Sequence, residues 1–156
     1  MELERITDKL EITDVLCRYA TALDTRDWAL LAHVFAPDAV YTIGAHGDFT
    51  GPRAIGAKIA SLIGGYESTQ HMITNPVVEI DGDTANASCY LHGQHYLPDQ
   101  RTGGNTYEMG GTYRDELRRT ADGWRITRRV LDVVWREGNA AISAEAQRRY
   151  AEASGG

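Results

Sequence analysis

The chain has 156 residues, of which 42% are hydrophobic and 24% charged, and its formal net charge is −6. This length and composition are typical of one soluble globular domain with a single core. The negative charge argues against a nucleic-acid-binding surface, which needs clustered positive charge. The start, MELERITDKLEI, is charged and no apolar run reaches transmembrane length, so we expect no membrane association.

We expect one domain over residues 1–156, with an ordered core to about residue 150 and a frayed tail at residues 151–156. The two cysteines, Cys17 and Cys89, form no CxxC pair or disulfide framework. Reduced thiols and a cytoplasmic location are therefore the expectation.

The first half of the chain is predicted to be mainly helical. Apolar residues recur at helical spacing from Leu3 to Leu23, which indicates one long helix that buries this stripe. Asp27 is placed to cap a short second helix that Pro37 ends. A short strand, AVYTI, and a third helix, TGPRAIGAKIASLIGG, follow, and the Gly64-Gly65 pair stops that helix.

The second half changes to the period of strands, with hairpin turns at residues 81–83 and 121–123. The predicted strands are residues 68–80, 84–97, 106–120 and 124–137. Gly110-Gly111 indicates a bulge within the third of them. Residues 140–150 are predicted to be helical.

Helices followed by a meander of long strands indicate the α+β class. We expect a curved antiparallel sheet wrapped around the N-terminal helices as a cone. The concave face of such a sheet, closed at one end by helices, leaves an internal pocket.

Metal binding is not indicated. The five histidines form neither an HxH nor an HExxH motif. His92 and His95 are three apart on a predicted strand, so their side chains should point to opposite faces. We therefore expect no metal site.

Three residues are candidates for acid/base chemistry. Asp24 lies where the first helix must end, against the unfavourable end of the helix dipole, so its presence there needs a reason. His71 begins a strand, and Tyr19 lies on the buried stripe of the helix. A solvated loop carboxylate, a surface histidine and a core tyrosine are the alternatives.

The last strand carries arginine on both of its faces. Simple alternation places Arg129 on one face and Arg128 on the other. A half-buried arginine must find a carboxylate or an anionic ligand. A structural ion pair to Asp24 or to another acid is the alternative to a catalytic role.

Five segments in order resemble the SnoaL-like branch of the nuclear-transport-factor-2-like superfamily. They are RYATALDTRDW, FAPDAVYT, GDFTGPRAI, TQHMITNPVVEIDGDTANA and GGTYRDELRRTADGWRITRR, and they span nearly the whole chain. The resemblance implies a cystatin-like α+β barrel with an internal pocket. Within the superfamily the chain resembles scytalone dehydratase, bile acid 7α-dehydratase and hexachlorocyclohexane dehydrochlorinase.

The resemblance also implies roles for four residues in a cofactor-independent lyase or isomerase. His71 would remove a proton from carbon, and Asp24 would orient its ring. Tyr19 would polarise a substrate oxygen or protonate the leaving group. Arg129 would stabilise negative charge or hold Asp24, with Arg128 as the alternative if the register differs.

The expected substrate is a small hydrophobic cyclic molecule, because the expected pocket lining is apolar. The expected lining residues are Trp28, Phe35, Met72, Tyr90, Leu131 and Trp135. No cofactor is expected, because proton abstraction followed by loss of water or movement of a double bond needs only these parts.

Two other function classes stay open at this point. One is a polyketide-type cyclase, and the other is a non-catalytic small-molecule-binding protein or a subunit like the small subunits of ring-hydroxylating dioxygenases. A homo-oligomer, either dimer or trimer, is expected because a long curved sheet leaves apolar surface that another copy can cover.

Overall fold

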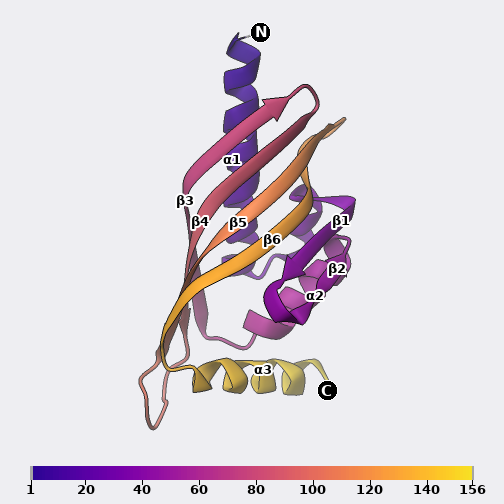
Figure 1. Cartoon of the computed structure of the whole chain (residues 1–156). Helices are drawn as coiled ribbons and strands as arrows, with labels where there is room; N and C mark the ends of the chain where they lie inside the picture. The colour runs from indigo at the N-terminus through magenta and orange to yellow at the C-terminus, as the bar shows by residue number, and fades with distance from the viewer. Residues whose placement is uncertain (1, 156) are drawn as a thin grey trace.

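A six-stranded sheet organises the fold in this computed structural model, which describes residues 2–155 (Figure 1). The strands are β1 (Phe35–Ile43), β2 (Asp48–Thr50), β3 (Ser68–Asp81), β4 (Thr84–Tyr96), β5 (Thr106–Thr120) and β6 (Gly123–Gly138). The helices are α1 (Glu2–Thr25), α2 (Pro52–Ile63) and α3 (Ala141–Ser154), with short 3-10 helices η1 (Trp28–His33) and η2 (Gly44–His46).

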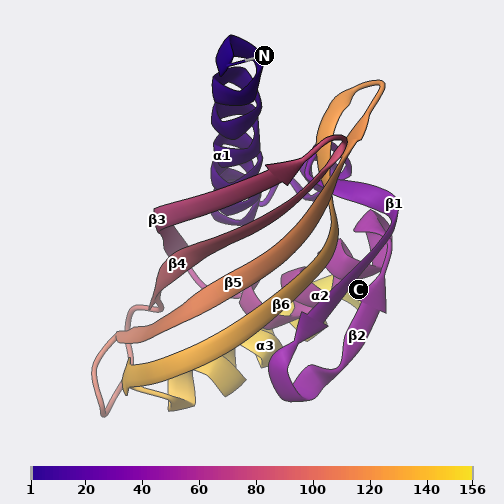
Figure 2. The ribbon, with the colours of Figure 1, turned by 45° about the horizontal axis from the view of Figure 1, so that its top comes forward.

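The strand order is β2-β1-β6-β5-β4-β3. All neighbours are antiparallel except β1 and β6, which run parallel. The sheet is long, twisted and open, and its strands curve strongly (Figure 2). α1 packs against β3 and β6, and α2 packs against η1 and α3. The predicted α+β class with a curved sheet is confirmed, although the sheet does not close into a full barrel.

The first helix buries only part of its apolar stripe. Its C-terminal half contributes Ile12, Leu16 and Tyr19 to the core, whereas Leu3 and Leu10 are exposed. The N-terminal end of α1 projects beyond the body of the molecule (Figure 1). The stripe predicted over residues 3–23 is therefore wrong at its start, because the residue of this part that faces the sheet is Asp8, which accepts hydrogen bonds from Arg119 of β5 and from the Trp124 indole of β6.

The segment after α1 forms less helix and more strand than predicted. Asp27 caps η1 as expected, since its Oδ1 accepts from the Leu30 N–H at 3.2 Å. However, η1 ends at His33, and β1 already begins at Phe35, which pairs with Ile126. The register shift between Phe35 and Val40 accommodates the proline that we expected to end a helix.

Two bulges in β6 change which side chains face the concave side. Ile126 pairs with Leu117 and Arg128 with Glu116, so Thr127 is an extra residue. Val134 is extra in the same way, between the pairs of Val133 and Trp135. The strict alternation predicted for this strand is therefore wrong. The inward-facing residues are Trp124 and Ile126, then Arg129, Leu131 and Val133, and finally Arg136.

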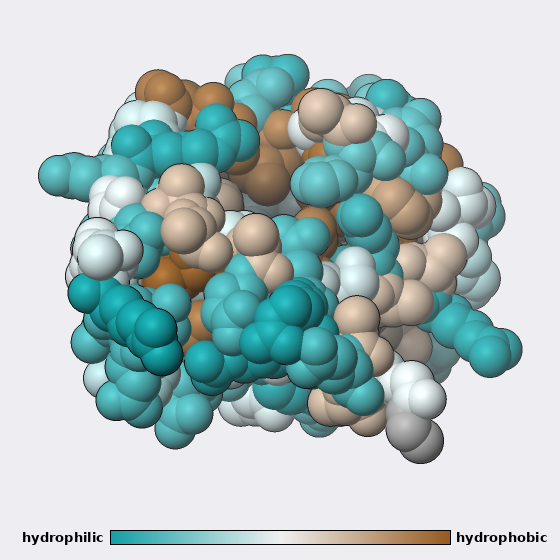
Figure 3. All heavy atoms as spheres, turned by 90° about the horizontal axis from the view of Figure 1, so that it is seen from below, coloured by the Kyte–Doolittle hydropathy of each residue, from teal (hydrophilic) through white to brown (hydrophobic). Residues whose placement is uncertain are grey.

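The C-terminal helix closes one end of the sheet against a pair of glycines. A Cβ on Gly65 would lie 1.8 Å from the Ala146 carbonyl oxygen, so only glycine allows this approach. α3 runs to Ser154 rather than ending near residue 150, so residues 151–154 are helix instead of a frayed tail, and Gly156 lies outside the described residues. From this end the surface is mostly hydrophilic, with apolar areas in the hollows (Figure 3).

Among residues 2–155, no helix combines the length and apolar character that a membrane crossing requires. Cys17 is exposed and Cys89 is buried, and both thiols are free.

Candidate active site

Asp24 and His71 form a direct hydrogen-bonded pair. The His71 Nδ1 lies 2.6 Å from the Asp24 Oδ1, and the His71 backbone N–H donates to the Asp24 Oδ2 at 2.8 Å. The Thr69 hydroxyl donates to the Asp24 Oδ1 at 2.9 Å. The sequence analysis named both members of this pair, and the structure brings them together. These hydrogen bonds explain why an aspartate lies at the C-terminal end of α1, where the helix dipole is unfavourable for a carboxylate.

The end of α1 fixes where Asp24 lies. The Asp27 N–H donates to the Ala22 carbonyl at 3.0 Å and the Arg26 N–H to the Leu23 carbonyl at 3.3 Å, which is a Schellman ending. Arg26 holds the left-handed position of this motif with φ of 59°, where glycine is usual. Its guanidinium compensates by donating to the Leu23 carbonyl at 2.6 Å and to the Thr69 hydroxyl at 2.8 Å.

The electrostatics of the pair determine the tautomer of the imidazole. Partial burial alone would raise the pKa of Asp24, but hydrogen bonds from the His71 ring and backbone outweigh burial and hold it below its ordinary value. An ionised carboxylate can only accept hydrogen bonds, so Nδ1 of His71 carries the proton. In the neutral form of the ring, the other nitrogen, Nε2, is then the acceptor.

The His71 ring lines a cavity of about 260 Å³ on the concave side of the sheet. Most of the lining is apolar, with contributions from the end of α1, from α2 and from strands β1, β4, β5 and β6. The polar groups include the tyrosines described below, the two further histidines His46 and His95, Arg136, and Ser143 and Gln147 of α3. A mostly apolar cavity with convergent polar groups is the usual form of a small-molecule site.

Five buried tyrosines line this cavity, and three of them, Tyr19, Tyr41 and Tyr113, form one cluster. Of the five, only Tyr19 was predicted from the sequence. The hydroxyls of Tyr19 and Tyr41 lie 3.3 Å apart, and the ring of Tyr113 packs edge-on against both. Burial raises the pKa of Tyr19, and it raises those of Tyr41 and Tyr113 well above the ordinary value. All three hydroxyls therefore stay protonated at neutral pH and can donate to a ligand oxygen.

Arg129, rather than Arg128, faces inward, but it does not hold Asp24. Its guanidinium makes a two-pronged pair with Asp115, with both hydrogen bonds at 2.7 Å. It also lies 4.4 Å from the Tyr19 ring and 4.1 Å from the Tyr113 ring. Burial alone would lower the pKa of Arg129, but Asp115 raises it well above the ordinary value. Arg129 therefore places positive charge behind the tyrosines.

His95 is a cavity residue that the sequence analysis missed. Its ring lines the cavity 5.5 Å from the His71 ring, and its Nδ1 donates to the Tyr107 carbonyl at 3.0 Å. His92 does point to the opposite face, as predicted, where it pairs with Glu108. The predicted opposite orientation of His92 and His95 is confirmed, but His95, the inward-facing one of the two, was not predicted as a cavity residue.

Burial lowers the pKa of His95 to about 4. The unfolded chain, with the ordinary histidine value of about 6.5, binds a proton that the folded protein does not. Above pH 6.5 the ionisation of His95 therefore has little effect on the free energy of unfolding, and that free energy falls as the pH drops from 6.5 towards 4. We expect urea unfolding to show roughly 2 kcal/mol less stability at pH 5 than at pH 7.5 from His95. His95→Phe should flatten this pH dependence, and an equal dependence in both proteins would contradict the assignment.

Only one of the six expected lining residues, Leu131, faces this cavity. Phe35 is buried behind it, with the Arg129 guanidinium 5.9 Å from its ring. Met72, Tyr90 and Trp135 are 39%, 56% and 42% exposed on the outer face of the sheet, so their assignment to the pocket is wrong. The strand period puts them there: His71 faces inward, so its neighbour Met72 faces outward.

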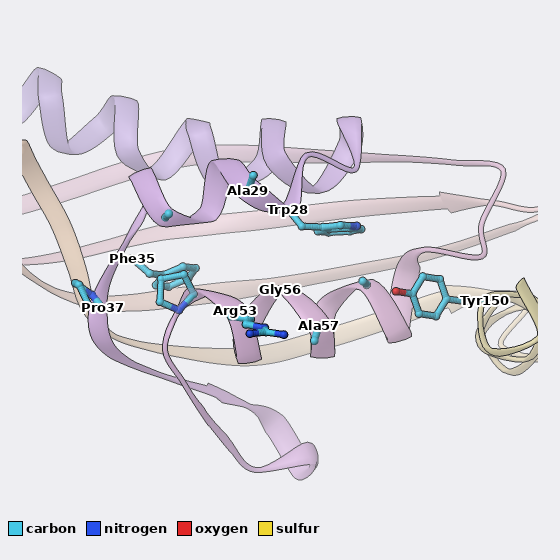
Figure 4. A pocket seen from close by; sticks show the side chains of 11 residues that line it. Trp28, Ala29, Phe35, Pro37, Arg53, Gly56, Ala57 and Tyr150 are labelled. Carbon is cyan, nitrogen blue, oxygen red and sulfur yellow. The ribbon is translucent and has the colours of Figure 1, made fainter. Parts of the chain in front are cut away.

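Trp28 lies in a different hollow, a shallow surface groove of about 690 Å³ between η1 and α2 (Figure 4). Phe35 contributes to its lining, Arg53 lies at its edge, and Tyr150 of α3 borders one end. The groove contains no histidine or acidic side chain. It therefore lacks the groups for acid/base chemistry that the inner cavity has.

Within the described residues, no group of three or more histidine, cysteine, aspartate or glutamate side chains is placed to hold a metal ion.

The SnoaL-like domain pattern matches residues 4–130. This chain belongs to the SnoaL-like family. An uncharacterized protein of Mycobacterium tuberculosis is 34% identical to it over 132 residues, which is 83% of this chain and 88% of that relative.

Solved structures agree with the fold. A protein of Kribbella flavida superposes with a TM-score of 0.80 at 28% identity, covering 92% of this chain and 99% of its own. A hexachlorocyclohexane dehydrochlorinase superposes with a TM-score of 0.79 at 22% identity, covering 90% of this chain and 94% of its own. At that identity the dehydrochlorinase supports the fold alone, which is the cystatin-like fold that other neighbours are described as having.

Proposed function

We propose that this protein is a cofactor-independent acid/base lyase or isomerase of the dehydratase type, acting on a small hydrophobic cyclic substrate. The observation that carries the proposal is the 2.6 Å contact between the Asp24 carboxylate and the His71 ring, with that ring lining an apolar cavity. A histidine held in one tautomer by a partly buried carboxylate is a suitable base near neutral pH.

In this mechanism the Nε2 of His71 takes a proton from a carbon next to a carbonyl group. The electron pair of the broken C–H bond forms a double bond, and the carbonyl oxygen gains negative charge. Tyr19 and Tyr41 are placed to donate hydrogen bonds to an oxygen in the cavity, which lowers the energy of that charge. Asp24 stabilises the imidazolium that forms.

The product then depends on whether a group leaves and on where the proton goes. In a dehydration the neighbouring hydroxyl departs with a proton from His71 or from a tyrosine and leaves as water. In an isomerisation His71 returns the proton to another carbon. The substitution His71→Ala tests the proposal, because it should abolish either reaction, and analysis of the product distinguishes these reactions from a carbon–carbon bond-forming cyclisation.

We also propose that the protein forms a homo-oligomer through the outer face of its sheet. Met72, Tyr90 and Trp135 lie on this face, and Val134 on the same part of β6 is 73% exposed. An exposed apolar area of this kind usually marks an interaction site. We expect wild-type protein to sediment as a dimer or trimer and Tyr90→Lys to sediment as a monomer with an unchanged circular dichroism spectrum. A monomeric wild type would contradict this.

The two free thiols favour a cytoplasmic location.

A further inference from the structure

The cavity lining contains a basic side chain but no acidic one among the described residues. Arg136 is the one arginine or lysine that lines it, and no aspartate or glutamate among the described residues does so. The whole chain, by contrast, carries a formal net charge of −6. Arg136 is exposed and makes no hydrogen bond or ion pair within the described residues. A cation without a protein partner at the rim of an apolar cavity is suited to bind an anionic group of a ligand.

The second bulge of β6 is what turns Arg136 into the cavity. With Val134 as the extra residue, Trp135 pairs with Gly110 on the outer face and Arg136 pairs with Met109 on the inner face. The indole occupies the space above Gly110, since a Cβ there would lie 2.0 Å from the Trp135 Nε1. Because Gly110 has no side chain, the Trp135 indole can pack over it on the outer face of the sheet. The next residue, Arg136, then faces inward.

Arg136 and His71 lie in one row across the sheet. His71 pairs with Gly93, Gly93 with Met109, and Met109 with Arg136. Three strand spacings separate the ends of this row, so their Cα atoms are about 14 Å apart along the sheet, and side chains that point into the concave side approach each other more closely. Between them Gly93 has no side chain and Met109 has a flexible one. An elongated ligand can therefore lie along the row.

We propose that Arg136 binds a carboxylate of the substrate, at the opposite end of the cavity from the C–H bond that His71 breaks. The substrate class is then a hydrophobic cyclic ketone or hydroxy ketone that also carries a carboxylate about one or two ring lengths from the reacting carbon. This assignment of the reacting end rests on the proposed function. The anion contact itself depends only on the cavity and Arg136.

The test uses two probes of the same size and shape, the charged biphenyl-4-carboxylate and the neutral biphenyl-4-carboxamide, titrated calorimetrically at pH 8. The carboxylate is ionised at this pH and an ordinary histidine is neutral, so Arg136 is the cation in the lining. We expect wild-type protein to bind the carboxylate about ten- to a hundredfold more tightly than the carboxamide. Arg136→Gln should remove this preference and leave the affinity for the carboxamide unchanged.

Arg128→Gln is the matched control, because Arg128 lies on the same strand but faces outward, and it should keep the full preference. The inference is overturned if wild-type protein does not prefer the carboxylate, if it binds neither probe at millimolar concentration, or if Arg136→Gln keeps the preference. His71→Ala separates the two proposals. If that variant turns over substrate normally while the carboxylate preference persists, the lyase proposal fails and the anion site stands. If it abolishes turnover while wild type shows no preference, only the anion site fails.

Discussion

His71→Ala is expected to lower kcat/KM by about 10²- to 10⁴-fold, the usual contribution of a general base. The substrate for this measurement comes from a screen of cyclic enones and β-hydroxy ketones, with and without a carboxylate. Loss of the imidazole removes the acceptor for the C–H proton, whereas the cavity and its tyrosines remain. Asp24→Asn should cause a loss of similar size, because an amide carries no charge to stabilise the imidazolium and does not fix the tautomer.

Two controls make this result specific. His92→Ala removes a histidine from the neighbouring strand on the outer face, where it pairs with Glu108, and it should leave kcat/KM unchanged. The folded state of His71→Ala is checked by its circular dichroism spectrum and thermal midpoint. Wild-type turnover in both His71→Ala and Asp24→Asn would show that the pair is not catalytic. An equal loss in His92→Ala would show that the effect is not local to the cavity.

Local rules made Asp24 and His71 candidates, but their pairing was predicted from the resemblance to the SnoaL-like family. Asp24 lies at the end of a helix where a carboxylate is unfavourable unless something binds it. His71 lies near the start of the strand that the Asp81-Gly82-Asp83 turn ends, although a register shift between Thr74 and Val77 separates that turn from the pairing of His71 with Gly93. Gly110-Gly111 likewise indicated the irregularity that the structure shows in the pairing of β5 with β6.

The rest of the site depends on features that leave no local pattern. The extra residues Thr127 and Val134 are ordinary strand formers, so nothing in their identity indicates a bulge. Yet Thr127 decides that Arg129 rather than Arg128 faces inward, and Val134 decides that Arg136 rather than Trp135 faces the cavity. The partner of Arg129 is Asp115, fourteen residues earlier on the neighbouring strand. Asp24, which its expected role suggested as the partner, could not be distinguished from Asp115 without the register.

The wrong predictions of lining residues have a different cause, because the strand period alone already places Met72 on the outer face. If His71 faces inward, Met72 cannot, whatever its hydrophobicity. Choosing lining residues by apolar character selected the outer face, where Tyr90 and Trp135 also lie. Apolar exposed residues on an open sheet indicate a surface for association as readily as a pocket.

Asp115→Asn is expected to destabilise the fold by about 3–5 kcal/mol, because it leaves the charge of Arg129 buried without a counterion. Both side chains of this pair are 0% exposed, and Arg129 already has one buried nitrogen, Nη1, without a hydrogen-bond partner. For a domain of this size the loss corresponds to a fall in Tm of roughly 6–20 °C. Urea unfolding and a thermal scan at pH 7.5 measure it.

The exposed pair of Arg118 and Asp38 provides the control, since removing it with Asp38→Asn should leave the unfolding midpoint nearly unchanged. The double variant Asp115→Leu with Arg129→Met should be more stable than Asp115→Asn alone, because it removes both charges together. If Asp115→Asn costs no more than the exposed pair, then Arg129 is not held as a buried cation. In that case the positive charge behind Tyr19, on which its proposed role as a hydrogen-bond donor partly depends, would be absent as well.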